Sequence, residues 1–280
     1  MTSINPSSVV FGNRLEWRTF AERRPLFLER FENLKRALDA AYIRTLTNAG
    51  KLESMIFFTS RQCADDFMEI MLVCGNGEGN AGEKLLRSLY ERVVLVAYLH
   101  KFPDQIDAYF EYYHVTSKKV LDAARYLWGD EAASPARIRE IEENYERVKN
   151  SYRNRTCPKC GRKESGMSWT PVAFFDMAKA VGLDRYAFYA YTMPLLQAHP
   201  SVKGTLGRLD GEPEGPISWG ERVDREKADR VLMTAHALLL HLFDVQLERF
   251  QIEGLDSLAR TAAEDWKPIW DGAESTSAQA

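Results

Sequence analysis

Residues 83–99, EKLLRSLYERVVLVAYL, decide the fold of this chain. The apolar run 93–96 covers every direction around a helix axis, so this helix is expected to be central in a helical bundle. Its first half carries Glu83, Arg87 and Glu91, which are spaced i, i+4, i+8 and therefore share one edge of the helix. Such a ladder is either an exposed row of ion pairs or the lining of a polar cleft between helices, where buried charges need partners.

Outward from this stretch, apolar residues recur at spacings of three and four along most of the chain. The pattern predicts helices at about 24–48, 52–71, 83–99, 103–128, 134–154, 170–181, 184–198 and 221–252. No long run alternates with a period of two. We therefore predict an all-α, single-domain bundle of seven to eight helices with a long C-terminal helix. The predicted domain spans 24–254 with a basic CxxC loop at 155–169, after an N-terminal extension, 1–23, and before a tail, 255–280, that ends in disorder.

Composition limits the classes of function. A net charge of −3 over 280 residues gives no general attraction to nucleic acid or to an anionic membrane. No run approaches the roughly 18 uncharged apolar residues of a spanning helix, and the opening residues lack the pattern of a secretory signal. Four cysteines do not make a disulfide framework. We expect a cytoplasmic, reduced protein with no membrane partner.

His199 is the candidate partner for the charge ladder. It follows an aromatic-rich helix, RYAFYAYTMPLLQA (185–198), at the point where that helix gives way to a loop. A histidine near a helix end is also a common surface or capping residue. If the ladder lines a cleft, however, His199 is placed to complete it.

Three segments taken together resemble a known family: LLRSLYE (85–91), MSWTPVAFFDMAKAVGL (167–183) and AHPSVKG (198–204). The family is an uncharacterised prokaryotic group of all-helical proteins known as a domain of unknown function, and the resemblance covers roughly residues 30–210. That family in turn looks distantly similar to the HEPN helical bundles, many of which are RNases of defence or toxin–antitoxin systems. HEPN nucleases place Arg and His four to six residues apart on one helix, with a polar residue after the Arg, and no Arg–His pair of this chain meets both conditions. The resemblance therefore implies a site assembled from Arg87 and His199 on different helices.

The chemistry of such a site can be defined from its residues. RNA cleavage without a metal needs a base, an acid and positive charge on the phosphate. His199 can act as acid or base near neutral pH, Arg87 can hold phosphate through its planar donors, and Glu91 can orient either of them. The same three residues could equally bind a small anionic ligand or fix the register of the helices.

CPKCGRK (157–163) contains the one CxxC of the chain, Cys157 and Cys160. Its spacing is that of one zinc knuckle, but a structural zinc needs four ligands and no second knuckle follows. The alternatives are an intrachain zinc completed by other residues, a zinc shared between two copies of the chain, or a loop without metal. We predict no other cofactor.

A basic run surrounds this motif, with seven Lys or Arg residues and no acid over residues 147–163. Such a run is commonly a solvated face, but it can also track phosphates while Tyr152 stacks on a base. The candidate nucleic-acid-binding residues are Arg147, Lys149, Tyr152, Arg153, Arg155, Lys159, Arg162 and Lys163.

Two hypotheses follow. One is a HEPN-like, metal-independent RNase or nucleic-acid-processing effector of a defence or stress system, whose ligand is RNA or another phosphate compound. The other is a non-catalytic binding or scaffold module with an internal network of Glu83, Arg87 and Glu91. The last helix either packs in the core or forms a homodimer seam. Its His236 and His241 are five residues apart and point in different directions, unlike the i, i+4 histidines of a zinc protease.

Overall fold

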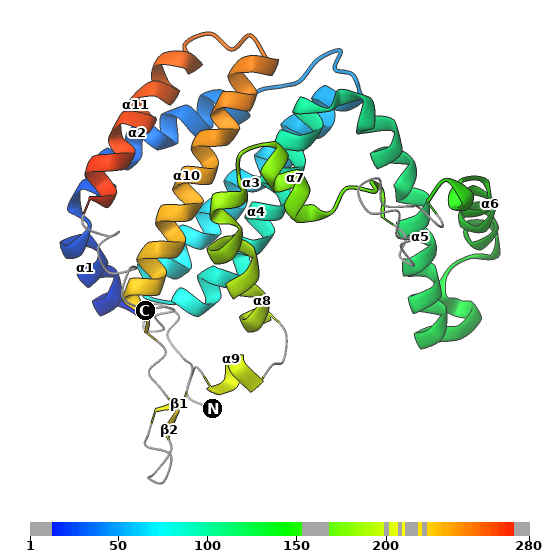
Figure 1. Cartoon of the computed structure of the whole chain (residues 1–280), viewed down its shortest axis with the longest axis horizontal. Helices are drawn as coiled ribbons and strands as arrows, with labels where there is room; N and C mark the ends of the chain where they lie inside the picture. The colour runs from blue at the N-terminus through cyan, green and yellow to red at the C-terminus, as the bar shows by residue number, and fades with distance from the viewer. Residues whose placement is uncertain are drawn as a thin grey trace, which may run out of the picture. The chain divides into compact units, whose positions relative to one another are not determined.

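A computed structural model describes residues 13–152, 168–198, 202–206, 209–210, 218–219 and 223–271 (Figure 1). Its class is all-α, as the sequence predicts. The helices are α1 (Arg14–Arg23), α2 (Pro25–Tyr42), α3 (Lys51–Gly75), α4 (Gly79–Lys101), α5 (Ile106–Trp128), α6 (Pro135–Tyr152), α7 (Phe174–Ala180), α8 (Met193–Ala198), α9 (Val202–Leu206), α10 (Arg225–Arg249) and α11 (Leu255–Trp270). Extended structure among these residues amounts to a two-residue antiparallel pairing of β1 (Leu209–Asp210) with β2 (Ser218–Trp219).

The helices group into two compact units. The first unit comprises Met1–His100 with Val181–Ala280, and the second comprises Lys101–Ala180. The boundaries of a single bundle at 24–254 stay a prediction.

The core of the first unit forms around α10. This helix packs along α3 and against α11, and α11 packs along α2 (Figure 1). Leu232, Leu238 and Leu239 of α10 are completely buried. By length and composition α10 could cross a membrane, but two thirds of its most apolar stretch, 67%, is buried inside the protein, as in a core helix. Two roles were expected for this helix, packing in the core or forming a homodimer seam, and in the structure it packs in the core.

Glycines allow α3, α4 and α10 to approach closely. A Cβ atom on Gly82 would lie 2.5 Å from Cys74 Sγ of α3. A Cβ atom on Gly79 would lie 2.8 Å from the backbone nitrogen of Ala228 in α10. The sequence CGNGEGNAG (74–82) therefore does more than end α3, because its last two glycines lie inside α4 at helix contacts.

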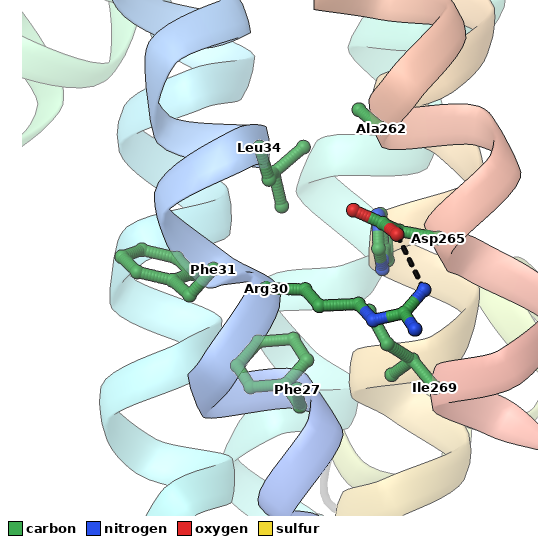
Figure 2. Close-up of a pocket in the computed structure, with 8 residues that line it drawn as sticks. Phe27, Arg30, Phe31, Leu34, Ala262, Asp265 and Ile269 are labelled. Carbon is green, nitrogen blue, oxygen red and sulfur yellow. Dashed lines mark hydrogen bonds and ion pairs between the residues drawn. The ribbon is translucent and has the colours of Figure 1, made fainter.

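Helices α1 and α11 lie outside the bundle boundaries expected from the sequence. Phe20 of α1 and Trp270 of α11 are nevertheless buried in the first unit. On α11, Asp265 accepts hydrogen bonds from Arg30 at 2.5 Å and from Asn33 at 2.8 Å, both on α2. Figure 2 shows Arg30 reaching across from α2 to this carboxylate. Charged residues dominate α1, which obscures its apolar period, whereas α11 is one continuous helix that buries Leu255, Ala259, Ala262 and Ile269 at helical spacings.

The second unit is built on the pairing of α5 with α6 (Figure 1). Its buried core is small and consists of Val115, Val148 and Tyr152, with Tyr112 and Tyr145 packed against it. The hydroxyl of Tyr152 donates a hydrogen bond to the carbonyl of Ala108 at 2.8 Å.

Candidate functional site

The charge ladder of α4 divides between two sets of partners. Arg87 Nε donates to Glu91 Oε1 at 2.8 Å, so the second half of the ladder is an i, i+4 ion pair on a partly exposed surface. Glu83 is buried and lies 3.9 Å from Lys227 Nζ of α10. Burial raises the pKa of Glu83, although Lys227 and Arg230 oppose the rise. The ladder thus faces α10 at its start and the segment before α8 further along.

That segment is fixed to α4 by a buried tyrosine. Tyr90 is fully buried, and its hydroxyl donates to the carbonyl of Leu183 at 3.0 Å. Burial and the nearby Asp184 raise the pKa of Tyr90 to about 12, so the phenol stays protonated and remains a donor. After Leu183 the chain forms a 3-10 turn, Asp184–Tyr186, and a π-helical turn, Phe188–Thr192. Single π-helical turns are rare in proteins, and those that occur often lie at functional sites.

The guanidinium group of an arginine lies over the ring of each tyrosine in these two turns. Arg185 Cζ lies 4.8 Å from the ring centroid of Tyr186, and Arg87 Cζ of α4 lies 4.7 Å from that of Tyr191. Arg230 Cζ of α10 lies 5.7 Å from the ring centroid of Tyr189. We call this set the Arg–Tyr face; its members are Arg87, Arg185, Arg230, Tyr186, Tyr189 and Tyr191. Cation–π contacts of this kind hold each guanidinium in place without neutralising it.

Arg185 also meets a histidine of α10. Its Nη2 atom lies 3.1 Å from His241 Nε2, and the rings of Tyr186 and His241 meet edge to face. Because a guanidinium can only donate, Nε2 is the acceptor and the proton of the neutral ring lies on Nδ1. Burial and the adjacent Arg185 lower the pKa of His241, which keeps the ring neutral. Within the described part of the chain, neither Arg185 nor Arg230 has a carboxylate within ion-pair distance, so the face keeps net positive charge.

The predicted site residues fall in different places. Arg87 and Glu91 are in contact, whereas His199 lies outside the described residues. Arg185 and His241 were not predicted as a pair, since 56 residues separate them and a helix-spacing rule cannot find them. The available signal was a run of three tyrosines beside an arginine in RYAFYAY (185–191).

Part of the basic run can be located. Arg147 Nη2 contacts His114 Nε2 at 3.3 Å, and Lys149 pairs with Glu146. Tyr152 is 1% exposed, so a ring enclosed in the α5–α6 core cannot stack on a base, which corrects the role expected for it. The remaining candidates lie outside the described residues: Arg153, Arg155, Lys159, Arg162 and Lys163.

The metal prediction concerns Cys157 and Cys160, which also lie outside the described residues. Cys63 and Cys74 on α3 are buried free thiols whose pKa burial raises. Over the ranges that the structure describes, no three His, Cys, Asp or Glu side chains gather in a way that could hold a metal ion.

The pocket between α2, α10 and α11 belongs to the packing of these helices and is not a binding site (Figure 2). It is lined by Phe27, Phe31, Leu34 and Ile269 around the Arg30 to Asp265 ion pair, and it is too narrow to admit a water molecule. His236 borders it and accepts a hydrogen bond from Trp270 Nε1 at 3.1 Å. As predicted, His236 and His241 point to different surroundings.

A family of unknown function, DUF5677, matches residues 53–216 of the chain. The chain is a member of DUF5677. No curated protein and no solved structure matches it. The DUF5677 segment contains all but the first two residues of α3, together with α4, the second unit and the turns that carry the three tyrosines. Helix α10, which supplies Arg230 and His241, lies beyond the matched residues.

Proposed function

We propose that this DUF5677 protein binds single-stranded RNA on the Arg–Tyr face and cleaves it without a metal. The observation that carries the proposal is the stacking of three arginines on three tyrosines of one short segment. Guanidinium groups bind phosphates, while exposed aromatic rings stack on unpaired bases. Tyr189 is 40% exposed and adjoins Phe188, which is 56% exposed, so aromatic surface is accessible beside the arginines.

The length of the face suits a short stretch of a single strand. Arg230 and His241 are eleven residues apart on α10, which corresponds to about 16 Å along a helix. Arg185 contacts the His241 end and Tyr189 contacts the Arg230 end. The segment 185–189 therefore runs antiparallel to α10, and the arginines along it can hold successive phosphates of one strand.

Arg185 and His241 are assigned the cleavage chemistry. A phosphate that binds Arg185 competes for the guanidinium that now donates to His241 Nε2. Once freed, Nε2 can accept the proton of a ribose 2′-hydroxyl, while Arg185 stabilises the charge that develops on the phosphate. Glu91 holds Arg87 for a neighbouring phosphate. His199 keeps its predicted role as the second acid or base, in line with the HEPN-like hypothesis.

Binding is tested by fluorescence anisotropy with a labelled single-stranded RNA of about 20 nucleotides at low salt. Arg185→Ala and Arg230→Ala should each weaken binding at least about tenfold and make the affinity less sensitive to salt. Arg260→Ala is the matched control, because Arg260 is an exposed arginine of α11 that pairs with Asp256. Equal affinity for all four proteins would contradict the proposed face.

Cleavage is tested by gel analysis of the same RNA in the presence of EDTA. His241→Ala and His199→Ala should abolish cleavage while leaving RNA affinity and melting temperature near those of the parent chain. If the parent chain neither binds nor cleaves RNA, and Arg87→Ala instead lowers the melting temperature markedly, the ladder is a structural ion network and the scaffold hypothesis holds.

A further inference from the structure

Helix α5 carries an apolar edge whose large side chains are exposed. The residues concerned are spaced three and four apart in alternation: Phe110, Tyr113, Ser117, Val120, Ala124 and Leu127. This is the spacing of the a and d positions of a coiled coil. Phe110, Tyr113, Val120 and Leu127 are 39%, 58%, 64% and 65% exposed. We call this edge the α5 seam.

A groove runs beside the α5 seam. Its volume is about 400 Å³, and Tyr113, Val120 and Ala124 of the seam line one side of it. Ala133 and Ile141 line the other side, where α6 begins. Grooves of this kind accept the apolar face of a further helix.

The charges around the seam indicate which helix that is. The positions that flank a and d hold no Asp, Glu, Lys or Arg; they are Tyr109, His114, Thr116, Leu121, Ala123 and Trp128. The α5 positions beside the seam therefore bring no like charges together, and Arg137 of α6, which also lines the groove, is paired with Glu140. Along its length, α5 is acidic at the start, with Asp107 and Glu111, and mostly basic later, with Lys118, Lys119 and Arg125. Antiparallel pairing of two copies places acidic ends beside basic ends, whereas parallel pairing places like beside like.

We propose that two copies of the chain associate through the α5 seam, with the two α5 helices antiparallel about a two-fold axis between residues 118 and 119. Phe110 of one copy then lies opposite Leu127 of the other, and Ser117 lies opposite Val120. The contact is isologous, as in most homodimers. The two α5–α6 hairpins together form a four-helix bundle, which enlarges the small core of the second unit. This inference stands independently of RNA binding.

Sedimentation equilibrium of the full chain tests the association. The parent chain should dimerise at micromolar concentration, and Val120→Glu should weaken dimerisation at least about 100-fold. Tyr126→Glu is the matched control, because Tyr126 is 89% exposed on α5 but lies off the seam. Circular dichroism verifies that both variants stay folded; if Val120→Glu does not, Leu127→Glu takes its place. A parent chain that stays monomeric at about 100 µM would overturn the proposal, as would equal dimerisation of the seam and control variants.

Disulfide trapping tests the direction of pairing. In a chain with Cys157→Ser and Cys160→Ser, one protein carries Phe110→Cys and a second carries Leu127→Cys. Mild oxidation of the mixture should yield the mixed disulfide dimer, and neither protein alone should cross-link efficiently. Efficient cross-linking of the Leu127→Cys protein with itself would indicate parallel helices and overturn the antiparallel arrangement.

Discussion

At the scale of single residues, His236 is the clearest source of pH dependence in the first unit. It is 1% exposed and packs against the rings of Phe27, Phe67 and Trp270. Burial lowers the pKa of His236 to about 4, although Asp265 opposes the shift. Trp270 donates to Nδ1, so the neutral ring carries its proton on Nε2, which has no hydrogen-bond partner among the described residues.

We predict that His236 makes folding sensitive to mild acid. The unfolded chain binds a proton at this histidine near pH 6.5, whereas the folded chain does so only near pH 4. Stability is therefore complete above about pH 7 and is lost as the pH falls through that window, by about 3 kcal/mol at most. Urea unfolding at pH 5 and pH 7 measures the loss.

His236→Asn is the control for this prediction. Its side-chain oxygen can still accept from Trp270 but does not titrate. The variant is expected to be less stable than the parent at pH 7, yet to lose less stability between pH 7 and pH 5. Parallel losses in the two proteins would show that other groups, such as His241, dominate the acid response.

At the scale of helices, the contacts of α4 depend on the absence of a side chain at Gly79. Replacing glycine by alanine inside a helix normally stabilises it by about 0.5–1 kcal/mol. Here the added methyl would lie 2.8 Å from both the nitrogen of Ala228 and the carbonyl oxygen of Asp224, which are backbone atoms at the start of α10. Gly79→Ala should therefore destabilise the chain by about 2 kcal/mol.

Thermal and urea unfolding measure this change. Lys84→Ala serves as the control, because Lys84 is exposed on the same helix and its loss should change stability by less than about 0.5 kcal/mol. A gain in stability on Gly79→Ala would mean that α4 and α10 separate easily.

The helices also show how far the sequence can be read. The apolar periods of α3, α4 and α5 predict these helices to within a few residues, because apolar side chains recur at helical spacing along each of them. Helix α11 falls in the predicted tail, although Leu255, Ala259, Ala262 and Ile269 are buried at helical spacings that the sequence also shows. The Arg–Tyr face could not be predicted from the sequence. It joins α4, two irregular turns and α10, and sequence spacing does not encode contacts between distant helices. Arg87 and Glu91 are found because their contact lies within one helix.

At the scale of the whole molecule, the two units differ in how much core they possess. Ile56, Phe67 and Leu238 are among many completely buried residues of the first unit, whereas α6 buries only Val148 and Tyr152. Helices with few buried apolar contacts open more readily. Backbone amides of α6 should therefore exchange with deuterium at least about 100-fold faster than those of α10.

Hydrogen exchange followed by mass spectrometry measures this contrast on dilute protein, where association through the α5 seam is weakest. The peptides that cover α3 and α10 serve as internal references for the slowest exchange. Equal protection of α6 and α10 would show that the second unit is stabilised by more than its own core.

The position of α10 has a practical and an evolutionary consequence. An expression fragment trimmed to residues 53–216 would keep α3 and α4 but lose the helix that covers them, so it should be insoluble. The contact of Arg185 with His241 joins the DUF5677 segment to a helix that lies beyond it. Under the proposed function, a relative that retains the arginine and tyrosines but has changed the position equivalent to His241 should bind RNA without cleaving it.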